Sequence, residues 1–509
     1  MDRMNLKVLS CLVALFATSI ILPAQTAGSA SAPPPSAFDK WADSVKKPAD
    51  WLSWGADIRV RDEYLPNAVS LSNADPLFEQ NVVRFRARVW GTLTPVADLS
   101  LNVRLSAEPR EFTKPASFGQ RGSASSITGR GASGMDWRYG IFDNLNVKWS
   151  NIGGQPLTLI VGRQDILIGD FYDWWLLADG TPGDGSWAFF LDSARLTYEA
   201  KEIKTKFDLI YIYQSPLPDD WLPTIGDQHY SDPPRFPGTD HPLTEQRESG
   251  LVVYVSNKSI EKTTLDGYFI YKHDDRVTFR RRGAPWTPGD NADIYTLGGK
   301  ITGTPAEHWQ YSVEGAYQFG QKEDSVNDGT GGARRFAERD IDAFGGKAKL
   351  TYLFKDKLNN QVSLVGEFLS GDDPSTSGKD EMFDLLWGRW PRWSELYIYS
   401  YAPETSGKIA QMNNLLRFGP SWTVNPMKGM SFSAVYNAMF APEEVPTRAV
   451  APRFSNDGDF RGHYLQTVLK YQFNKHWQAH LWAEFVWEGD FYAQRDRMAF
   501  IRPEIMFTF

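Results

Sequence analysis

Apolar and polar residues alternate along most of the chain after Trp51, and this period of two residues constrains the fold more than any other feature. In the segment WGADIRVRDEY, for example, Ile58 and Val60 alternate with Asp57 and Arg59. Successive side chains of a β-strand point to opposite faces of the sheet, so such a segment has one apolar and one polar face. The pattern predicts an all-β chain whose strands separate an apolar environment from a polar one.

The lengths of the segments and of their connections narrow the choice among all-β folds. Many segments run for about ten residues or more, which is the length of a tilted membrane-spanning strand. Short connections, such as 95–98 and 474–476, alternate with long polar ones, such as 215–247 and 371–411. A secreted sandwich or propeller would have to accommodate such loops with few apolar anchors. Short periplasmic turns and long extracellular loops are typical of outer-membrane barrels.

The alternation gives eighteen candidate strands, and an even number places both ends of a bacterial barrel in the periplasm. The last strand ends in Phe509, and a C-terminal aromatic residue of this kind resembles the insertion signal of outer-membrane proteins. We therefore predict that residues 51–509 form a transmembrane antiparallel β-barrel of about 18 strands. The expected strands are 52–64, 81–94, 98–108, 141–150, 156–164, 188–198, 205–214, 248–256, 263–273, 292–303, 309–320, 339–353, 361–370, 412–424, 430–440, 462–473, 477–488 and 496–509.

The aromatic content has an explanation in a barrel. The chain contains 19 Trp, 21 Tyr and 31 Phe, an unusual number for its length. Outer-membrane barrels carry aromatic girdles where the apolar band meets the two interfaces. Aromatic residues that fall near strand ends on the apolar face are Trp54, Trp149, Tyr213, Tyr352, Tyr471, Phe473, Trp477 and Phe509.

The N-terminus indicates the compartment. Arg3 and Lys7 precede an apolar run over 8–22, and small residues follow it. A basic start, a short apolar run and an Ala-x-Ala-like end are typical of a secretory signal peptide, and the run is too short for a spanning helix. We expect residues 1–27 to be a cleaved signal peptide, residues 28–50 to be a flexible periplasmic lead-in, and the mature chain to reside in the cell outer membrane.

Composition and motifs argue against several classes of function. Lys and Arg number 54 against 62 Asp and Glu, so the net charge is −8 and no nucleic-acid partner is expected. The single cysteine, Cys11, lies in the apolar N-terminal run, which leaves no thiol chemistry to the mature chain. There is no HExxH motif, and we expect neither an enzyme nor a cofactor or metal. Acidic clusters at 371–373 and 456–459 have the donors that Ca²⁺ uses, but ordinary turns explain them more simply.

If the apolar faces meet lipid, the polar faces line the interior, which in an ~18-stranded barrel is wide enough for an aqueous channel. Arginine is prominent there, because one expected strand carries Arg84, Arg86 and Arg88 and no acidic residue. A ring of Arg and Lys is one way in which a pore selects anions. The cations expected on the inner face are Arg59, Arg61, Arg84, Arg86, Arg88, Arg104, Lys148, Arg195, Lys300, Lys347, Lys349, Lys470 and Arg502.

Acidic residues share this inner face and support a second interpretation. A wall of ion pairs would brace the barrel without selecting anions, because the carboxylates would neutralise the arginines. Both interpretations stay open, and the arginine-rich second strand favours anion selectivity. The inward acids are Asp57, Glu63, Asp208, Asp266, Glu314, Glu367, Glu484, Glu488 and Glu504.

Two stretches of the chain resemble the alginate-export family of outer-membrane barrels. The first is 157–200 and the second is 368–404. With the barrel layout, the resemblance extends over most of the mature chain. The motifs that carry it are Gly162-Arg163-Gln164, Gly169-Asp170 and Asp192-x-x-Arg195-Leu196 in the first stretch, and Ser-Gly-Asp-Asp followed by Phe383-Asp384-x-Leu386 in the second.

The resemblance implies a monomeric channel of eighteen strands with an electropositive constriction that passes an anionic polysaccharide. It also adds Arg163 and Asp192 to the candidate pore-lining residues and supports Arg195, because all three fall in matching motifs. Arg163 has the same phase as the apolar Val161, so an inward position would require a β-bulge at Gly162.

We therefore expect a passive channel for an anionic polysaccharide or oligosaccharide, or for small anionic solutes. No ATP-binding motif is present, so a gradient would have to drive transport. The alternative is a general or nutrient-uptake porin with a charge-balanced eyelet. A third class is a barrel that serves as a scaffold or carries an active site in its loops. Outer-membrane lipid is an expected partner, a monomer is the expected state, and periplasmic secretion partners are left open.

Overall fold

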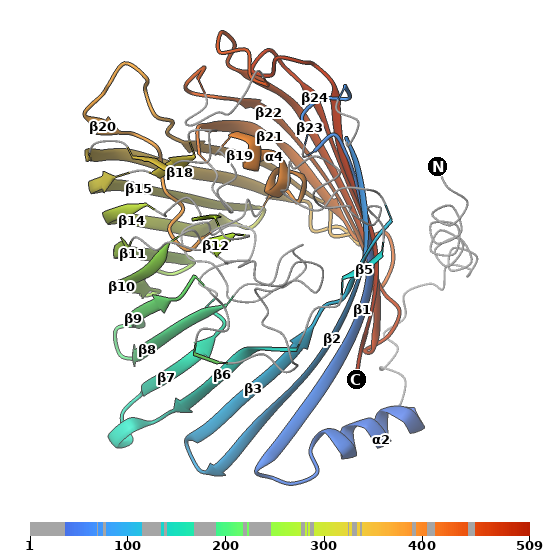
Figure 1. The fold of residues 1–509 in the computed structure, drawn as a ribbon. Helices are drawn as coiled ribbons and strands as arrows, with labels where there is room; N and C mark the ends of the chain where they lie inside the picture. Colours follow the sequence, from blue (N-terminus) through green and yellow to red (C-terminus); the bar gives the residue numbers. More distant parts are fainter. Residues whose placement is uncertain are drawn as a thin grey trace.

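The alternating segments pair in chain order and close into a barrel, which Figure 1 shows in a computed structural model. Eighteen antiparallel strands form the wall. β1 (Leu52–Pro66) pairs with β2 (Glu79–Val96) on one side and with β25 (Arg497–Thr508) on the other. The first and last strands therefore complete the ring, which is how barrels satisfy their edges in a membrane.

The remaining wall strands follow in order between β2 and β25. They are β3 (Leu99–Ala107), β6 (Ile141–Trp149), β7 (Leu157–Gln164), β8 (Leu191–Ala200), β9 (Thr205–Gln214), β10 (Arg247–Asn257), β11 (Thr263–Asp275), β14 (Asn291–Ala306), β15 (Trp309–Glu323), β18 (Arg339–Leu353), β19 (Gln361–Leu369), β21 (Leu415–Val424), β22 (Met430–Phe440), β23 (Phe460–Gln472) and β24 (Trp477–Glu488). Short strands in the connections are β4 (Arg110–Phe112), β5 (Gly134–Asp136), β12 (Arg280–Arg281), β13 (Ala284–Pro285), β16 (Ser325–Asn327), β17 (Ala333–Arg335) and β20 (Lys379–Asp380).

The structure describes the barrel wall and parts of its loops. The described residues are 36–68, 70–74, 78–113, 134–136, 140–166, 190–216, 221–222, 246–275, 280–281, 284–285, 290–323, 325–327, 333–335, 338–388, 393–404, 413–445 and 453–509. The expected signal peptide and the motif Gly169-Asp170 lie outside these residues. The signal peptide therefore stays a prediction.

Every strand predicted from the alternation is present, and its boundaries agree with the observed ones to within three residues. The prediction of a barrel with about eighteen strands is confirmed. One difference has a local cause: β14 runs on to Ala306 because the ladder with β15 shifts register between Gly303 and Ala306. Such an irregularity lets a strand continue past the point where simple alternation ends.

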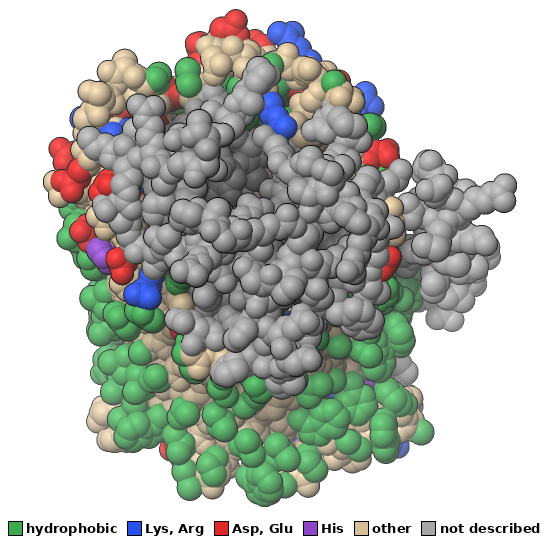
Figure 2. Space-filling model, viewed as in Figure 1, with side chains coloured by type: hydrophobic (Ala, Val, Ile, Leu, Met, Phe, Trp, Pro, Cys, Tyr) green, Lys and Arg blue, Asp and Glu red, His purple; other side chains and the backbone are tan. Residues whose placement is uncertain are grey.

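The alternation sorts side chains between lipid and interior, as strand β9 illustrates. Phe207, Leu209 and Tyr211 are exposed on the outer face, between 39 and 50%. Their neighbours Asp208 and Ile210 are almost completely buried on the inner face. Figure 2 shows the sum of these outer faces as a belt of hydrophobic side chains around the lower part of the barrel, with charged side chains gathered toward the other end. An apolar band flanked by polar ends is what a membrane-spanning barrel requires.

Aromatic side chains mark the periplasmic edge of this belt. They lie beside the short turns, where strands begin or end, and they are more than a third exposed on the outer face. Amphipathic rings favour this position at the level of the lipid headgroups. The periplasmic girdle includes Trp149, Tyr198, Phe207, Trp309, Phe354, Trp422 and Trp477.

Helices are few and short in the described part of the chain. α2 (Ala37–Lys46) precedes β1, the 3-10 helix η1 (Ile152–Gly154) forms a periplasmic turn, and α4 (Leu396–Glu404) follows β20 in the long connection between β19 and β21. None of the described helices is long and apolar enough to cross a membrane.

Candidate functional site

Charged side chains from three neighbouring strands face each other on the inner side of the barrel. The register of β1 and β2 places Arg59 opposite Arg86 and Arg61 opposite Arg84. Like charges in direct cross-strand pairs destabilise a sheet unless other groups separate them. Carboxylates from β1, β25 and the end of β3 do so here. We call the following set the charged wall: Asp57, Arg59, Arg61, Glu63, Arg84, Arg86, Arg88, Glu108, Arg110 and Glu504.

Each carboxylate of the charged wall serves more than one arginine. Glu504 Oε2 lies 3.0 Å from Nε of Arg61 and 3.6 Å from Nε of Arg59. Glu108 accepts from Arg59 Nη2 at 2.7 Å and also contacts Arg84. These shared contacts explain how so many cations are held close together. They also explain how β2 can carry three arginines on its inner face within five residues.

Asp57 and Glu63 complete the network from β1. Asp57 lies 2.8 Å from Nε of Arg88 and 3.5 Å from Nη2 of Arg86. Glu63 is 3.2 Å from Nη1 of Arg84. The wall therefore contains the ion pairs that the bracing interpretation expects.

The balance of the charged wall is nevertheless positive. Its six arginines face four carboxylates, so the formal charge exceeds neutrality by two. Nε and Nη1 of Arg86, and Nη1 of Arg59, are buried and have no hydrogen-bond acceptor among the described residues. Guanidinium N–H groups only donate, so these atoms require water or an anion as partner. The charged wall therefore holds buried guanidinium N–H groups for which the described residues supply no acceptor.

The other candidate arginines have individual carboxylate partners. Arg104 Nε lies 2.8 Å from Asp143, and its Nη1 lies 2.9 Å from Asp165. Nε of Arg195 is 2.8 Å from Asp208 on the neighbouring strand. These pairs are close to neutral and resemble a brace more than a selectivity element. Arg502 is likewise 3.1 Å from Glu395, although that acid belongs to a loop and not to a wall strand.

Arg163 and Asp192 form a pair at the extracellular ends of β7 and β8. Nε of Arg163 is 2.9 Å from Asp192, and its guanidinium lies 3.8 Å from the ring centre of Phe190. The ladders on both sides keep their register through Gly162, although its φ of +123° favours glycine. A Cβ there would lie 2.3 Å from the carbonyl oxygen of Leu145. The contacts of the pair account for its burial, and a pore-lining role for it stays a prediction.

The candidate lysines lie on inward positions of the ladders. Lys347 on β18 is the register partner of Glu314 on β15 and of Glu367 on β19, so acids flank it on both sides. Lys349 lies two residues further along the same face. Lys470 on β23 is opposite His480 on β24. The lysine positions therefore share the inner face with acidic or polar neighbours.

A second inner surface is apolar, which the sequence pattern did not predict. Its side chains come from β9 to β18 and are almost completely buried. Cross-strand partners share a face, and the register aligns Ile210 with Val252 and Val252 with Ile270. We call the following set the apolar wall: Ile210, Ile212, Val252, Ile270, Ala292, Ile294, Ala316, Ile341 and Ala343.

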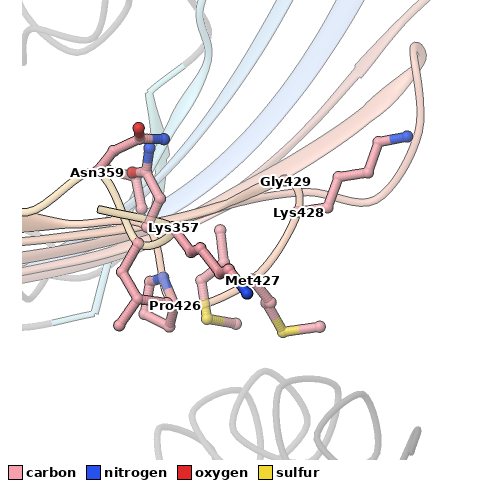
Figure 3. Close-up of a pocket in the computed structure, with 10 residues that line it drawn as sticks. Lys357, Asn359, Pro426, Met427, Lys428 and Gly429 are labelled. Atoms are coloured by element: carbon pink, nitrogen blue, oxygen red, sulfur yellow. The ribbon is translucent and has the colours of Figure 1, made fainter. Parts of the chain in front are cut away.

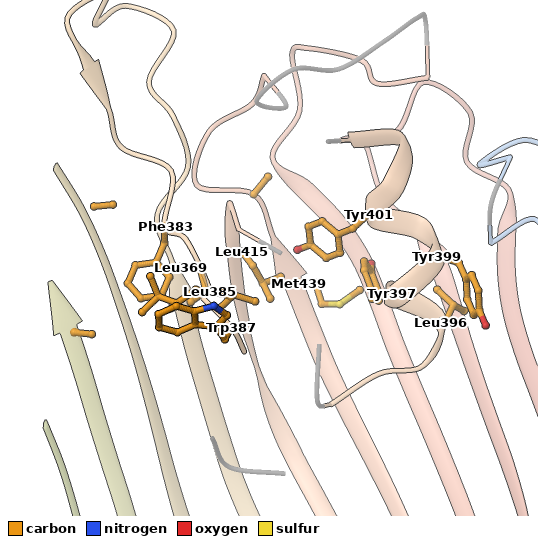
Figure 4. Close-up of a cluster of buried hydrophobic side chains, with 14 of the residues drawn as sticks. Leu369, Phe383, Leu385, Trp387, Leu396, Tyr397, Tyr399, Tyr401, Leu415 and Met439 are labelled. Carbon is orange, nitrogen blue, oxygen red and sulfur yellow. The ribbon is translucent and has the colours of Figure 1, made fainter. Parts of the chain in front are cut away.

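Part of the long connection between β19 and β21 covers the apolar wall. We call its described residues, 370–388 and 393–404, the inward loop. Phe383 and Trp387 are buried in the same cluster as the apolar wall. Figure 4 shows these two side chains close to Leu369 and Leu385. Gly250 on β10 makes room for the indole, since a Cβ there would lie 2.6 Å from it. The loop is thus held inside the barrel by the burial of large apolar side chains.

Hydrogen bonds fix this part of the inward loop. The side-chain amide of Gln318 donates to the carbonyl oxygen of Asp384 at 2.7 Å, and its oxygen accepts from the Asp384 N–H at 2.8 Å. The Asp384 carboxylate accepts from the N–H of Leu386 at 2.6 Å. Phe383, Asp384 and Leu386 are the motif residues of the second resembling stretch. In the structure, these residues help to hold the inward loop against the barrel wall.

The second half of the inward loop, with α4, is anchored by charges. The Glu484 carboxylate on β24 accepts from the N–H groups of Glu395 and Leu396 at 2.8 and 3.1 Å. It thereby caps the first turn of α4, where N–H groups lack helical partners. At the other end of α4, Arg461 Nη1 lies 2.8 Å from Glu404. The helix is therefore tied at both ends to the strands near the charged wall.

The sequence pattern predicts an ordinary polar connection over 371–411, and its inward fold was not predicted. The signal was present, because MFDLLW and the aromatic run around α4 are unusually apolar for a solvent-exposed connection.

Two other features, the acidic cluster at 371–373 and a surface pocket, do not belong to the site in the barrel interior. Among the described residues, no group of three or more His, Cys, Asp or Glu could hold a metal ion, and Asp372 is instead 2.9 Å from Arg339. A shallow pocket of about 500 Å³ lies between two periplasmic turns, around 357–359 and 425–431. Figure 3 shows Lys428 extending away from Lys357 and Asn359, so the pocket gathers no group of charges.

Comparison with known proteins adds a family and a fold. A family model described as "Alginate export" matches residues 242–500, which include the inward loop. No curated protein matches the chain. The structure of Pseudomonas aeruginosa OccK8 (OprE) is similar with a TM-score of 0.50 and 9% identity, over 90% of this chain and 98% of that one. Acinetobacter baumannii OccAB1 is similar with a TM-score of 0.49 and 12% identity, over 90% and 96%. At 9% identity, the similarity to OccK8 concerns the fold alone.

Proposed function

The chain belongs to the alginate export family and is an outer-membrane channel, and we propose that it passes an anionic polysaccharide or oligosaccharide of alginate-like chemistry. The observation that carries the proposal is the positive excess of the charged wall, with buried N–H groups of Arg59 and Arg86 that have no acceptor among the described residues. A polyuronate presents one carboxylate per sugar, and arginine binds carboxylates through paired N–H donors.

The proposed mechanism is diffusion along a gradient past weak, shared binding sites. Arginines of the charged wall replace the counterions of a passing carboxylate, and the wall's own carboxylates compete for the same donors. This competition keeps each contact brief, and conduction requires that binding be favourable on entry yet weak enough for release. The residues involved in this proposal are Arg59, Arg61, Arg84, Arg86 and Arg88, while Arg104, Arg163, Asp192, Arg195, Lys347, Lys349, Lys470 and Arg502 lie along the rest of the proposed path.

A second candidate function is a general or nutrient-uptake porin with a charge-balanced interior. It is favoured by the extent of ion pairing, since Arg104 and Arg195 each have close carboxylate partners. In that case the charged wall would brace the barrel and the identity of the solute would matter little.

Single-channel recording with added polymer separates the two candidates. The refolded mature chain is placed in a planar bilayer, and a polyuronate is titrated on either side. The proposal expects a concentration-dependent block by polyuronate and none by an uncharged dextran of similar length. Equal effects of the two polymers would support the general porin instead.

A variant with a matched control locates the effect. Arg59→Gln with Arg86→Gln removes the two side chains that have donors without acceptors, and it should weaken the polyuronate block about tenfold or more. The control, Glu307→Gln with Lys355→Gln, removes an exposed ion pair on the periplasmic turns, outside the proposed path, and should leave the block unchanged. Retention of the compact, heat-modifiable form on electrophoresis shows that both variants fold.

A further inference from the structure

Helix α2 lies outside the barrel wall, beside the start of β1 and the C-terminus (Figure 1). Ser36 and Asp39 form a capping box, in which Asp39 N–H donates to the Ser36 hydroxyl at 3.1 Å and Ser36 N–H donates to the Asp39 carboxylate at 2.8 Å. The helix ends at Lys46, because Pro48 disfavours helical backbone at Lys47. The helix is therefore a defined element within the expected flexible lead-in.

One side of α2 is fixed to the periplasmic edge of the barrel. The Asp39 carboxylate lies 2.9 Å from Nε2 of His476 and 3.2 Å from Nζ of Lys475. Trp54 Nε1 donates to the Val45 carbonyl oxygen at 2.8 Å, and Ala42 is completely buried. These contacts fix the rotation of the helix about its own axis.

This rotation leaves an aromatic face of α2 uncovered. Phe38 and Trp41 are three residues apart, on one side of the helix, and their side chains are 43 and 53% exposed. Each ring touches the barrel only with part of its surface: Trp41 lies 5.6 Å from the ring of Phe509, and Phe38 lies 6.4 Å from that of Phe507. The polar residues Lys40 and Asp43 occupy a different side of the helix.

The rings that α2 touches belong to the lipid-facing surface. Phe507 is the register partner of Ile58, which is 58% exposed on the outer face, and also of Trp477 in the periplasmic girdle. Trp54 stacks on Phe509 at 5.3 Å. Phe38 and Trp41 thus extend the same girdle, at the same end of the barrel, by one helix diameter.

We propose that α2 is an interfacial helix that inserts Phe38 and Trp41 into the periplasmic phospholipid leaflet of the outer membrane. Continuity with the girdle identifies the occupant, because the surface next to these rings already faces lipid. The exposed Lys40 and Lys47 lie where lysines can reach headgroup phosphates. The helix would then fasten the N-terminal lead-in, and with it the C-terminal strand, to the membrane surface. This inference does not depend on the solute that the channel carries.

The absence of cysteine from the mature chain provides a direct test. Cys11, the only cysteine, precedes the expected mature N-terminus, so Trp41→Cys and, on the opposite side of the helix, Asp43→Cys each provide one labelling site. Each variant of the mature chain is labelled with an environment-sensitive fluorophore and reconstituted in vesicles of phosphatidylcholine. Some vesicles contain phosphatidylcholine brominated on its acyl chains, which quenches fluorophores that enter the hydrocarbon.

The proposal expects brominated lipid to remove most of the fluorescence at position 41 and little at position 43, and dissolved iodide to quench in the opposite order. Strong iodide quenching at position 41 without lipid quenching would overturn it. So would efficient disulfide crosslinking of the unlabelled Trp41→Cys protein, because that result would place a second copy on this face. Heat-modifiable migration of both variants confirms that the barrel is folded in each case.

Discussion

The charged wall and the apolar wall occupy different parts of the same barrel interior and have opposite chemistry. The charged wall, on β1, β2 and β25 with Glu108 and Arg110 from the segment after β3, is built from arginines and carboxylates. The apolar wall, on β9 to β18, is built from isoleucine, valine and alanine. Both come from strands that expose apolar residues to lipid, so the outer face does not distinguish them. Only the side chains on the inner face of each strand distinguish the two walls.

The two walls have different structural roles. The apolar wall binds another part of the chain, because Trp387 and Phe383 cover it. The charged wall contains N–H donors of Arg59 and Arg86 that have no acceptor among the residues the structure describes. The inward loop contacts both sides: Trp387 lies against the apolar wall, and the Tyr399 hydroxyl donates to Glu63 of the charged wall at 3.3 Å. The inward loop therefore occupies part of the barrel interior and contacts both walls.

Removing the inward loop should have the largest effect. A variant in which a short Gly-Ser linker replaces residues 381–404 should conduct several-fold better than the native channel, because the interior widens. Single-channel conductance in a planar bilayer measures this. The same linker in place of the periplasmic turn 355–359 serves as control and should leave conductance unchanged. A conductance equal to the native value would show that the loop does not limit the passage.

A point substitution tests the apolar wall alone. Trp387→Ala should lower the free energy of unfolding by about 3 kcal/mol, because a fully buried indole is lost and its site cannot collapse. Urea unfolding of the reconstituted barrel gives this value. Trp487→Ala, at a position 39% exposed on the outer face, should cost much less. If both variants lost the same amount, the inward loop would not be held by this contact.

The positive excess of the charged wall can also be increased by a substitution. Glu63→Gln removes one carboxylate and keeps the size of the side chain, so the positive excess rises and anion preference should increase. A reversal potential in a salt gradient that moves toward the chloride limit would show this. Glu307→Gln, on a periplasmic turn and paired with Lys355 at 2.9 Å, should cause no shift. A shift of the same size in both variants would contradict a local role for the wall.

The smallest effect concerns α2 and acid pH. Hydrogen bonds with Ser36, together with those from His476 and Lys475, hold the pKa of Asp39 well below its ordinary value of 3.8. A lowered pKa means that the docking contribution is complete above the ordinary value and is lost as pH falls. A fluorophore at position 41 should therefore report release of α2 only below about pH 4. Asp39→Asn should abolish this pH dependence, and a transition near neutral pH would contradict the assignment.

The fold could be predicted from the sequence because a membrane imposes alternation on every strand. The alternation of apolar and polar residues alone predicts the eighteen strands and the inward arginines, such as Arg84 and Arg86. The partners of those arginines do not, since Glu108 and Glu504 come from other strands and only the register brings them together.

The inward loop could not be placed for a different reason. Ile210 and Ile212 interrupt the polar phase of β9, and in the sequence such residues look like additional apolar positions of a strand. Their significance appears only with Trp387, more than 170 residues later in the chain. Packing between distant segments leaves no periodic signal, whereas a strand does.

The most direct test of the account is the reversal potential of the native channel under a KCl gradient, compared with that of the Arg59→Gln, Arg86→Gln variant. The account predicts an anion-selective native channel whose preference falls sharply in the variant, because two of the six arginines of the charged wall are lost. An unselective or cation-selective native channel, or a preference that survives the substitutions, would contradict the role given to the charged wall.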